Sequence, residues 1–175
     1  MADWVLAVER AYVAAATAGP VQAPAPHDRH VLARARAAAS AVASHHLAVA
    51  APRSFGIVGG TDEDAELVLE AHRTWFAPRE IRRGDNALAA DIVCIYDATP
   101  IRAHELRRGT HVNALGGGPT DPDLVATIID EPCGLPALAA GRVEGRRLDE
   151  LTIFIGGDVA VAIRSLLAAE RAGTE

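Results

Sequence analysis

The chain has 175 residues, half of them hydrophobic, which is enough for one domain with a substantial core. Its net charge of -6 argues against binding to a nucleic-acid backbone and gives no sign of a basic membrane face. The chain contains no lysine, and all 17 of its Lys and Arg residues are arginine. The absence of lysine excludes Schiff-base chemistry, a P-loop lysine and a lysine general acid or base.

The sequence contains no apolar run of membrane-spanning length and no signal peptide, since the first residues are acidic where a signal peptide is basic and then apolar. We therefore expect a cytoplasmic protein. Cys94 and Cys133 are the only cysteines, and we expect buried thiols rather than a disulfide.

The N-terminal third is predicted to be helical. Apolar periodicity predicts helices at 4–16 and 31–48, separated by the proline-rich extended linker 20–26. Beyond residue 51, strands alternate with helices. In chain order we expect a strand at 54–58, a helix at 62–75, a strand at 80–82, one or two helical turns at 86–90, strands at 91–96 and 110–115, a helix at 121–125, a strand at 127–130, a helix at 135–140, a strand at 151–155 and a helix at 158–172.

This alternation predicts an α/β fold, a truncated Rossmann-like parallel sheet flanked by helices on both faces. Residues 76–90 are too few for a strand, a helix and another strand, so we expect that a βα unit has been lost. We divide the chain into an N-terminal helical arm at 1–50 and a degenerate Rossmann-like domain with a C-terminal helix at 51–175.

The stretch 54–65, SFGIVGGTDEDA, lies where a dinucleotide-binding loop is expected, but its residues differ from that loop. Gly59 and Gly60 form the turn, and Thr61 takes the position where a second glycine lets the backbone approach a pyrophosphate. The acidic residues 62–64 suit the dipole of the following helix and repel a phosphate there. We therefore expect no nucleotide cofactor.

Five segments in order are similar to the ornithine cyclodeaminase/μ-crystallin family: ARARAAASAVASHHLA (33–48), GIVGG (56–60), ADIVCIYDATP (90–100), LRRGTHVNALG (106–116) and DELTIF (149–154). Residues 4–24 also resemble the family's N-terminal helix and glycine turn. The resemblance implies a Rossmann domain and, in full-length members, NAD(P)-dependent reactions of amino or imino acids. It also implies that the sheet of the family's substrate domain is deleted here, around residues 26–30.

Carried over residue by residue, the resemblance implies a loss of catalysis. The substrate-binding Arg-Thr pair falls on Arg36 and Ala37, so only the arginine remains. The catalytic lysine is absent, and the Gly-Ala-Asp pattern with the catalytic aspartate falls on residues 116–118, which are all glycine. We therefore expect a pseudoenzyme with no catalytic residue.

Candidate binding residues come from the same positions. Arg36 either clamps a carboxylate or is a solvated helix arginine, and Gly117 and Gly118 form either an anion nest or a plain loop. The candidate ligand- or peptide-binding residues are Arg36, Gly59, Gly60, Thr61, Thr99, Asn113, Gly117 and Gly118.

Several histidines have spacings that raise the question of a metal. His27 and His30 flank the linker, and His45 and His46 are adjacent in the second helix. A zinc site usually adds cysteines or a carboxylate and a pair at i and i+4. We expect no metal.

Truncated relatives of this family occur as peptide-binding accessory proteins in ribosomal peptide natural-product pathways, and the chain looks most like those of crocagin biosynthesis. The resemblance implies a non-catalytic protein that binds a precursor peptide and presents it to modifying enzymes. One alternative is an NAD(P)-dependent amino-acid dehydrogenase or cyclodeaminase-like enzyme with an altered loop, and another is a partner subunit of a full-length family enzyme. A homodimer is expected, because the first two helices have apolar faces that lack a substrate domain.

Overall fold

The computed structural model of the protein describes residues 2–19, 28–48, 51–97, 102–116, 126–130, 134–145, 150–156 and 159–172. Its elements are α1 (Asp3–Ala18), α2 (Arg29–Leu47), β1 (Ser54–Val58), α3 (Asp62–His72), β2 (Glu80–Arg83), the 3-10 helix η1 (Gly84–Ala89), β3 (Ile92–Ile95), the 3-10 helix η2 (Ala103–Glu105), β4 (His111–Ala114), β5 (Thr127–Asp130), α4 (Gly134–Ala139), β6 (Thr152–Ile155) and α5 (Ala160–Ala172). Within these ranges no helix is long and apolar enough to cross a membrane.

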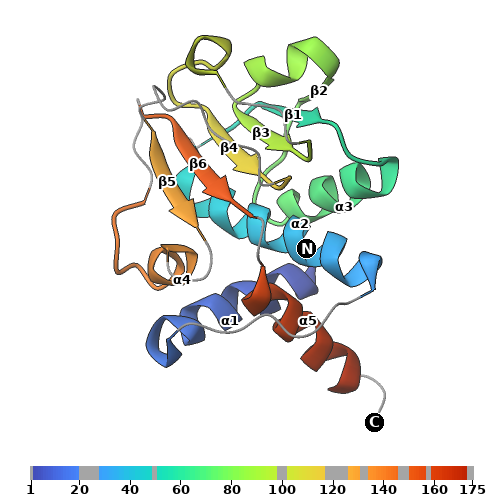
Figure 1. Ribbon diagram of the computed structural model, residues 1–175, viewed down its shortest axis with the longest axis vertical. Helices are drawn as coiled ribbons and strands as arrows, with labels where there is room; N and C mark the ends of the chain where they lie inside the picture. Colours follow the sequence, from blue (N-terminus) through green and yellow to red (C-terminus); the bar gives the residue numbers. More distant parts are fainter. Residues whose placement is uncertain are drawn as a thin grey trace.

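The six strands form one parallel sheet in the order β2-β1-β3-β4-β6-β5 (Figure 1). The chain moves from β1 outward to β2 and then returns to the other side of β1 as β3, so the direction of winding reverses between β1 and β3. The α/β Rossmann-like fold predicted from the sequence is confirmed. The segment after α3 provides β2 and η1 but no further strand, and β2 is an edge of the sheet.

The described α-helices pack on one face of the sheet, whereas the sequence predicted helices on both. Buried apolar residues of all five belong to one cluster with Phe55, Ile92 and Phe154. A second, smaller cluster contains Val93, Val112 and Ile153, which alternate with the first set along the strands and point to the opposite face. This second face is packed by residues of η1 and loops instead of α-helices.

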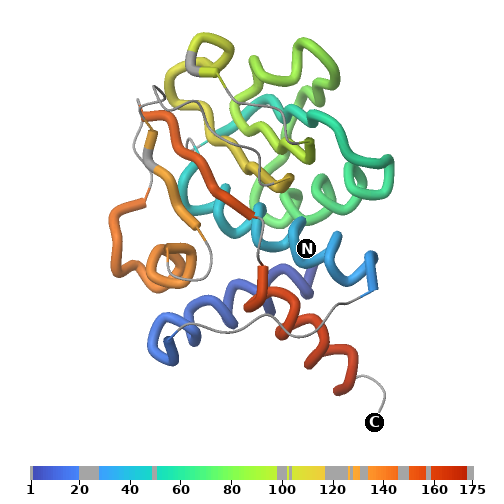
Figure 2. The backbone as a smooth tube through the Cα atoms, in the orientation of Figure 1, coloured from blue at the N-terminus to red at the C-terminus, as the bar shows by residue number. Residues whose placement is uncertain are grey.

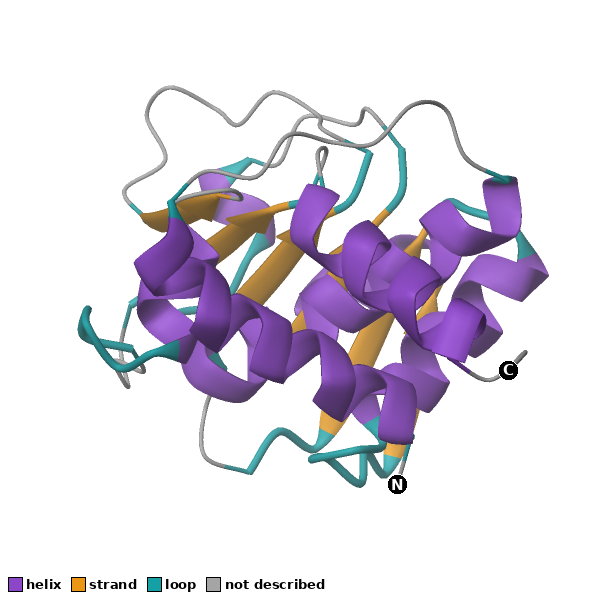
Figure 3. Ribbon diagram, turned by 90° about the horizontal axis from the view of Figure 1, so that it is seen from below, coloured by secondary structure: helices purple, strands orange, loops and turns teal. Residues whose placement is uncertain are grey.

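Helix α2 is the centre of the helical layer. Its small residues let it pack closely against the sheet and against α1, α3 and α5, and most of its length is buried. Helices α1 and α5 lie on the far side of α2 from the sheet, although they come from opposite ends of the sequence (Figures 1 and 2). Seen from the side of α1 and α5, helices cover the strands (Figure 3).

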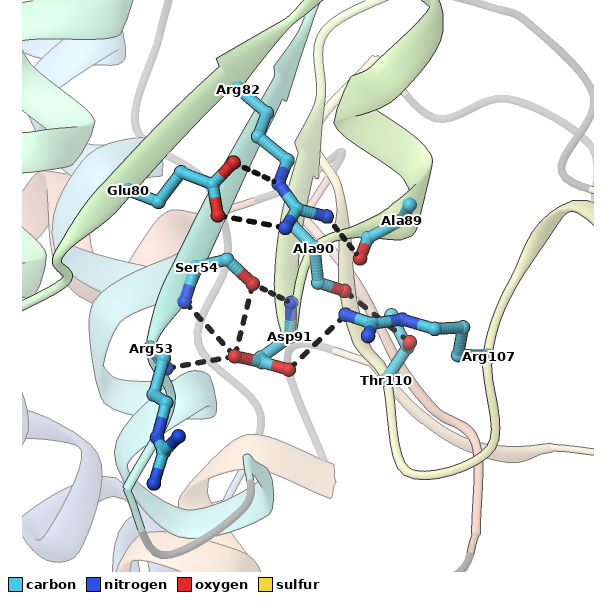
Figure 4. A network of polar contacts seen from close by, with 9 residues as sticks. All are labelled: Arg53, Ser54, Glu80, Arg82, Ala89, Ala90, Asp91, Arg107 and Thr110. Atoms are coloured by element: carbon cyan, nitrogen blue, oxygen red, sulfur yellow. Dashed lines mark hydrogen bonds and ion pairs between the residues drawn. The ribbon is translucent and has the colours of Figure 1, made fainter.

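The amino edge of the sheet is tied together by Asp91, just before β3 (Figure 4). One oxygen of its carboxylate accepts hydrogen bonds from the backbone N–H groups of Arg53 and Ser54, at 2.8 and 2.9 Å. Arg107 contacts the other oxygen at 3.3 Å. Partial burial alone would raise the pKa of Asp91, but these donors outweigh burial and lower it. The contacts of Asp91 therefore hold β1, β3 and the segment before β4 together at this edge.

Candidate functional site

The candidate site lies at the carboxyl edge of the sheet, where the winding reverses between β1 and β3. Open parallel sheets bind ligands in the crevice outside the carboxyl ends of strands at such a point. Here β1 is followed by Gly59 and Gly60, and β3 is followed by Tyr96 and Asp97. Figure 1 shows both strands ending on the side where α3 begins.

The turn after β1 requires glycine. Gly59 and Gly60 have φ angles of +65° and +77°, in the left-handed region that disfavours residues with a Cβ. A Cβ on Gly59 would lie 2.1 Å from a carboxylate oxygen of Asp97, and one on Gly60 would lie 2.9 Å from the ring of Tyr96. The two glycines therefore let the residues after β3 close over the turn.

The first turn of α3 satisfies its own donors. The Thr61 hydroxyl accepts a hydrogen bond from the Asp64 N–H at 3.2 Å, and the Asp64 carboxylate accepts from the Thr61 N–H at 2.9 Å. This capping box occupies the end of the helix that holds a phosphate in dinucleotide-binding proteins. Asp62 pairs with Arg83 at 3.1 Å at the same place.

A pyrophosphate does not fit this arrangement. Asp62, Glu63 and Asp64 make the first turn acidic, and the carboxylate of Asp97 lies over Gly59. The negative charges of these four side chains would repel a pyrophosphate bound at this turn. The acidic residues around this turn therefore disfavour a pyrophosphate there.

Arg36 lies at the same edge, on α2. Its Nε is buried and has no hydrogen-bond partner in the described part of the chain. Its charge acts on Tyr96: burial raises the pKa of Tyr96, Cys94 and Asp64 add to that rise, and Arg36 opposes it. An arginine with a buried donor of this kind is suited to a carboxylate ligand.

The path of α2 explains why Arg36 reaches this edge. Ser40, one turn further on, lies against Cys94 in the middle of β3, and Ser44 accepts a hydrogen bond from Asn113 of β4 at 2.9 Å. Arg36, Ser40 and Ser44 thus form a polar stripe of period four facing the sheet. The stripe begins at the carboxyl edge and ends near the amino edge, where Leu47 lies close to Thr152.

The structure brings four of the predicted binding residues to one edge: Arg36, Gly59, Gly60 and Thr61. It places Asn113 elsewhere, since this residue is fully buried and its amide bonds to Ser44 and Cys94. Thr99, Gly117 and Gly118 lie outside the described residues. Sequence reasoning missed Tyr96 and Asp97, although their position directly after a buried strand was an available signal.

Cys94 is a buried free thiol, as predicted, and burial raises its pKa to about 12. Cys133 lies outside the described residues. A thiol with this pKa is an inert core residue at neutral pH.

An open groove of about 400 Å³ runs along the edge strand β2. Its lining comes from β2 and η1 and includes Ile81, Arg82 and Asn86. Ile81 is 46% exposed, and Arg82 is held by Glu80 at 2.8 Å. The edge therefore presents apolar surface and, among the described residues, a strand with a neighbour on one side only, outside the carboxyl-edge site.

No protein-family model and no curated protein matches the sequence. Solved structures do match. The iminosuccinate reductase of Paracoccus denitrificans in complex with NAD+ is 21% identical, with a TM-score of 0.69 over 83% of this chain and 65% of that chain. An archaeal alanine dehydrogenase dimer with bound NAD is 20% identical, with a TM-score of 0.61 over 77% of this chain and 64% of that one.

A probable ornithine cyclodeaminase from Bordetella pertussis is 19% identical, with a TM-score of 0.59 over 81% of this chain and 68% of that chain. The chain therefore spans about two thirds of the length of these proteins. At such identities the likeness establishes the fold.

These comparisons correct the prediction that the chain is not an enzyme, since the three similar structures named above are of enzymes. That prediction depended on the absence of the family's catalytic lysine, its catalytic aspartate and its dinucleotide-binding loop. The same backbone fold carries enzymatic activity in these proteins, so those losses do not make the chain a non-enzyme.

Proposed function

We propose that this protein belongs to the ornithine cyclodeaminase/μ-crystallin family and binds a peptide at the carboxyl edge of its sheet. The observation that carries the proposal is the buried Nε of Arg36 at that edge, which has no hydrogen-bond partner among the described residues. A C-terminal carboxylate or an acidic side chain of a peptide supplies the missing acceptor. The natural ligand on this proposal is a ribosomal precursor peptide on its way to modifying enzymes in natural-product biosynthesis.

The charges at the carboxyl edge of the sheet suit a ligand that carries both positive and negative groups. Arg36 offers a cation, while Asp97 and the first turn of α3 offer carboxylates a short distance across the turn. A peptide carries carboxylate and ammonium groups together, whereas a dinucleotide carries only negative charge at its pyrophosphate. The groove along β2 adds an exposed strand that an extended peptide can pair with.

Calorimetric titration with the precursor peptide encoded nearest the gene tests the proposal. We expect Arg36→Leu to weaken binding by about 10- to 100-fold, because a hydrogen bond to a charged group contributes about 1.5–3 kcal/mol. Arg108→Leu is the matched control, since Arg108 is exposed and has no hydrogen bond or ion pair with another described residue. Equal affinities for the wild type and Arg36→Leu would remove Arg36 from the site.

A second candidate is an NAD(P)-dependent dehydrogenase or cyclodeaminase-like enzyme, favoured by the NAD-bound structures of this fold. The same calorimetry with NAD(H) and NADP(H) separates the two. Peptide binding without nucleotide binding favours the first proposal. Micromolar nucleotide binding favours the second and contradicts the repulsion expected at α3.

We also propose a cytoplasmic homodimer, supported by the dimeric alanine dehydrogenase of the same fold. Light scattering at several protein concentrations tests the dimer. A monomer at all concentrations would overturn it.

A further inference from the structure

A cluster of metal-ligand side chains lies away from the carboxyl edge. Glu9 of α1 and His45 and His46 of the last turn of α2 each offer one ligand atom, and these atoms lie within 4.8 Å of one another. His46 Nε2 is 3.4 Å from Glu9 Oε1, and each of these two side chains is 24% exposed. The cluster is therefore accessible to an ion and partly shielded from water.

The rings of the cluster are held in place. His45 stacks on Trp75 with ring centroids 4.5 Å apart and an interplanar angle of 14°. His46 meets His45 edge to face, at 4.9 Å and 66°. A ligand whose ring is already oriented loses less side-chain entropy on binding a metal.

We propose that Glu9, His45 and His46 form a zinc site. Two imidazoles and one carboxylate are a ligand set that zinc uses, and three protein ligands leave a fourth position for water. Tetrahedral zinc needs ligand atoms about 3.3–3.5 Å apart, given bonds of about 2.0–2.1 Å. One of the three separations already has this length, and all three ligand atoms lie within 4.8 Å of one another.

The site joins two elements that are distant in sequence. Glu9 comes from the middle of α1, and the histidines come from the last turn of α2, nine and ten residues after Arg36. A bound zinc ion would therefore fix α1 against α2 without touching the carboxyl edge. This placement makes the site independent of the proposed peptide site.

Calorimetry and thermal unfolding with zinc chloride test the site in the purified full-length chain. We expect one zinc ion per chain and a rise in the unfolding temperature with zinc concentration. His46→Gln and Glu9→Gln should each weaken zinc affinity by at least about ten-fold, since each removes one of three ligands. The double variant His30→Gln/Glu63→Gln is the matched control, because His30 and Glu63 form another surface His–Glu pair at 2.8 Å.

Cobalt supplies a second readout that does not depend on stability. Because His45 stacks on Trp75, cobalt bound by His45 should quench the fluorescence of Trp75. The quenching should be lost in Trp75→Phe, where only Trp4 remains, and in His46→Gln. No zinc binding, or equal zinc affinity in the wild type, His46→Gln and Glu9→Gln, would overturn the proposal.

Discussion

His72 and His111 are fully buried neutral imidazoles in one hydrogen-bonded chain. His72 donates from Nδ1 to the Val68 carbonyl at 2.7 Å and accepts at Nε2 from the Ser44 hydroxyl at 2.9 Å. Asn113 links this part to His111, whose Nε2 lies 3.1 Å from its amide oxygen. Burial in the core disfavours the charged form of both rings.

This network predicts a pH dependence of stability. Burial lowers the pKa of His72 to about 3 and that of His111 to about 4, against 6.5 in the unfolded chain. Between these values the unfolded chain binds more protons. The free energy of unfolding is therefore highest above pH 6.5, where both rings are neutral in the folded and the unfolded chain. It decreases as the pH falls toward 4, by up to about 1.4 kcal/mol per pH unit for each histidine.

Urea unfolding between pH 7.5 and about 4.5 measures this slope. His72→Gln/His111→Gln should flatten it, whatever the variant's absolute stability, whereas His104→Gln at an exposed position should leave it unchanged. An unaltered slope in the double variant would show that other groups cause the acid sensitivity.

Gly56 in the middle of β1 marks a close approach. A Cβ there would lie 2.1 Å from the carbonyl oxygen of Ala87 in η1, and neither backbone can move freely. Gly56→Ala should cost about 3 kcal/mol of unfolding free energy through overpacking. Gly84→Ala, with a φ of +62° but open space around it, should cost only about 1 kcal/mol. Equal losses in urea unfolding would mean that η1 does not pack against β1 as described.

At the scale of elements, α3 begins with a capping box at the helix end where dinucleotide-binding proteins hold a phosphate. Thr61→Ala removes the acceptor for the Asp64 N–H and should lower the unfolding free energy by about 1 kcal/mol. It should also speed hydrogen exchange in the first turn of α3. Glu66→Ala, at an exposed position of the same helix, should change stability by less than about 0.5 kcal/mol. Unchanged exchange in Thr61→Ala would show that the cap contributes nothing.

For the whole molecule, the sequence predicted most elements because apolar runs and helical periodicity are local signals. The six strands appear within a residue or so of their expected places. The face that each helix covers is set by tertiary packing, so the helical layer on one side was not predictable. The polar stripe of Arg36, Ser40 and Ser44 was visible in the sequence at period four, but Glu9 near His46 depends on how α1 folds back and left no local pattern.

The dimer prediction shows the same limit. It assumed that the first two helices have uncovered apolar faces, yet α2 is buried within the chain by α1, α3, α5 and the sheet. That argument for a dimer therefore does not hold for α2.

The same packing makes α1 part of the core. Val5, Val8 and Tyr12 are fully buried in the cluster that includes Phe55 and Phe154 of the sheet. If α1 and the sheet unfold as one unit, Tyr12→Ala should lower the unfolding free energy by about 3–5 kcal/mol, as large core truncations do. Val13→Ala, at a position 43% exposed on the same helix, should stay within about 0.5 kcal/mol.

Two probes test whether the unfolding is a single transition. Trp4 fluorescence, measured in Trp75→Phe, follows α1, because Trp4 contacts Glu70 of α3 at 3.3 Å, and far-ultraviolet circular dichroism follows the whole chain. Coincident midpoints in urea, both lowered in Tyr12→Ala, are expected for one cooperative core. If Trp4 is released first while the dichroism persists, residues 1–50 would instead include an arm of independent stability.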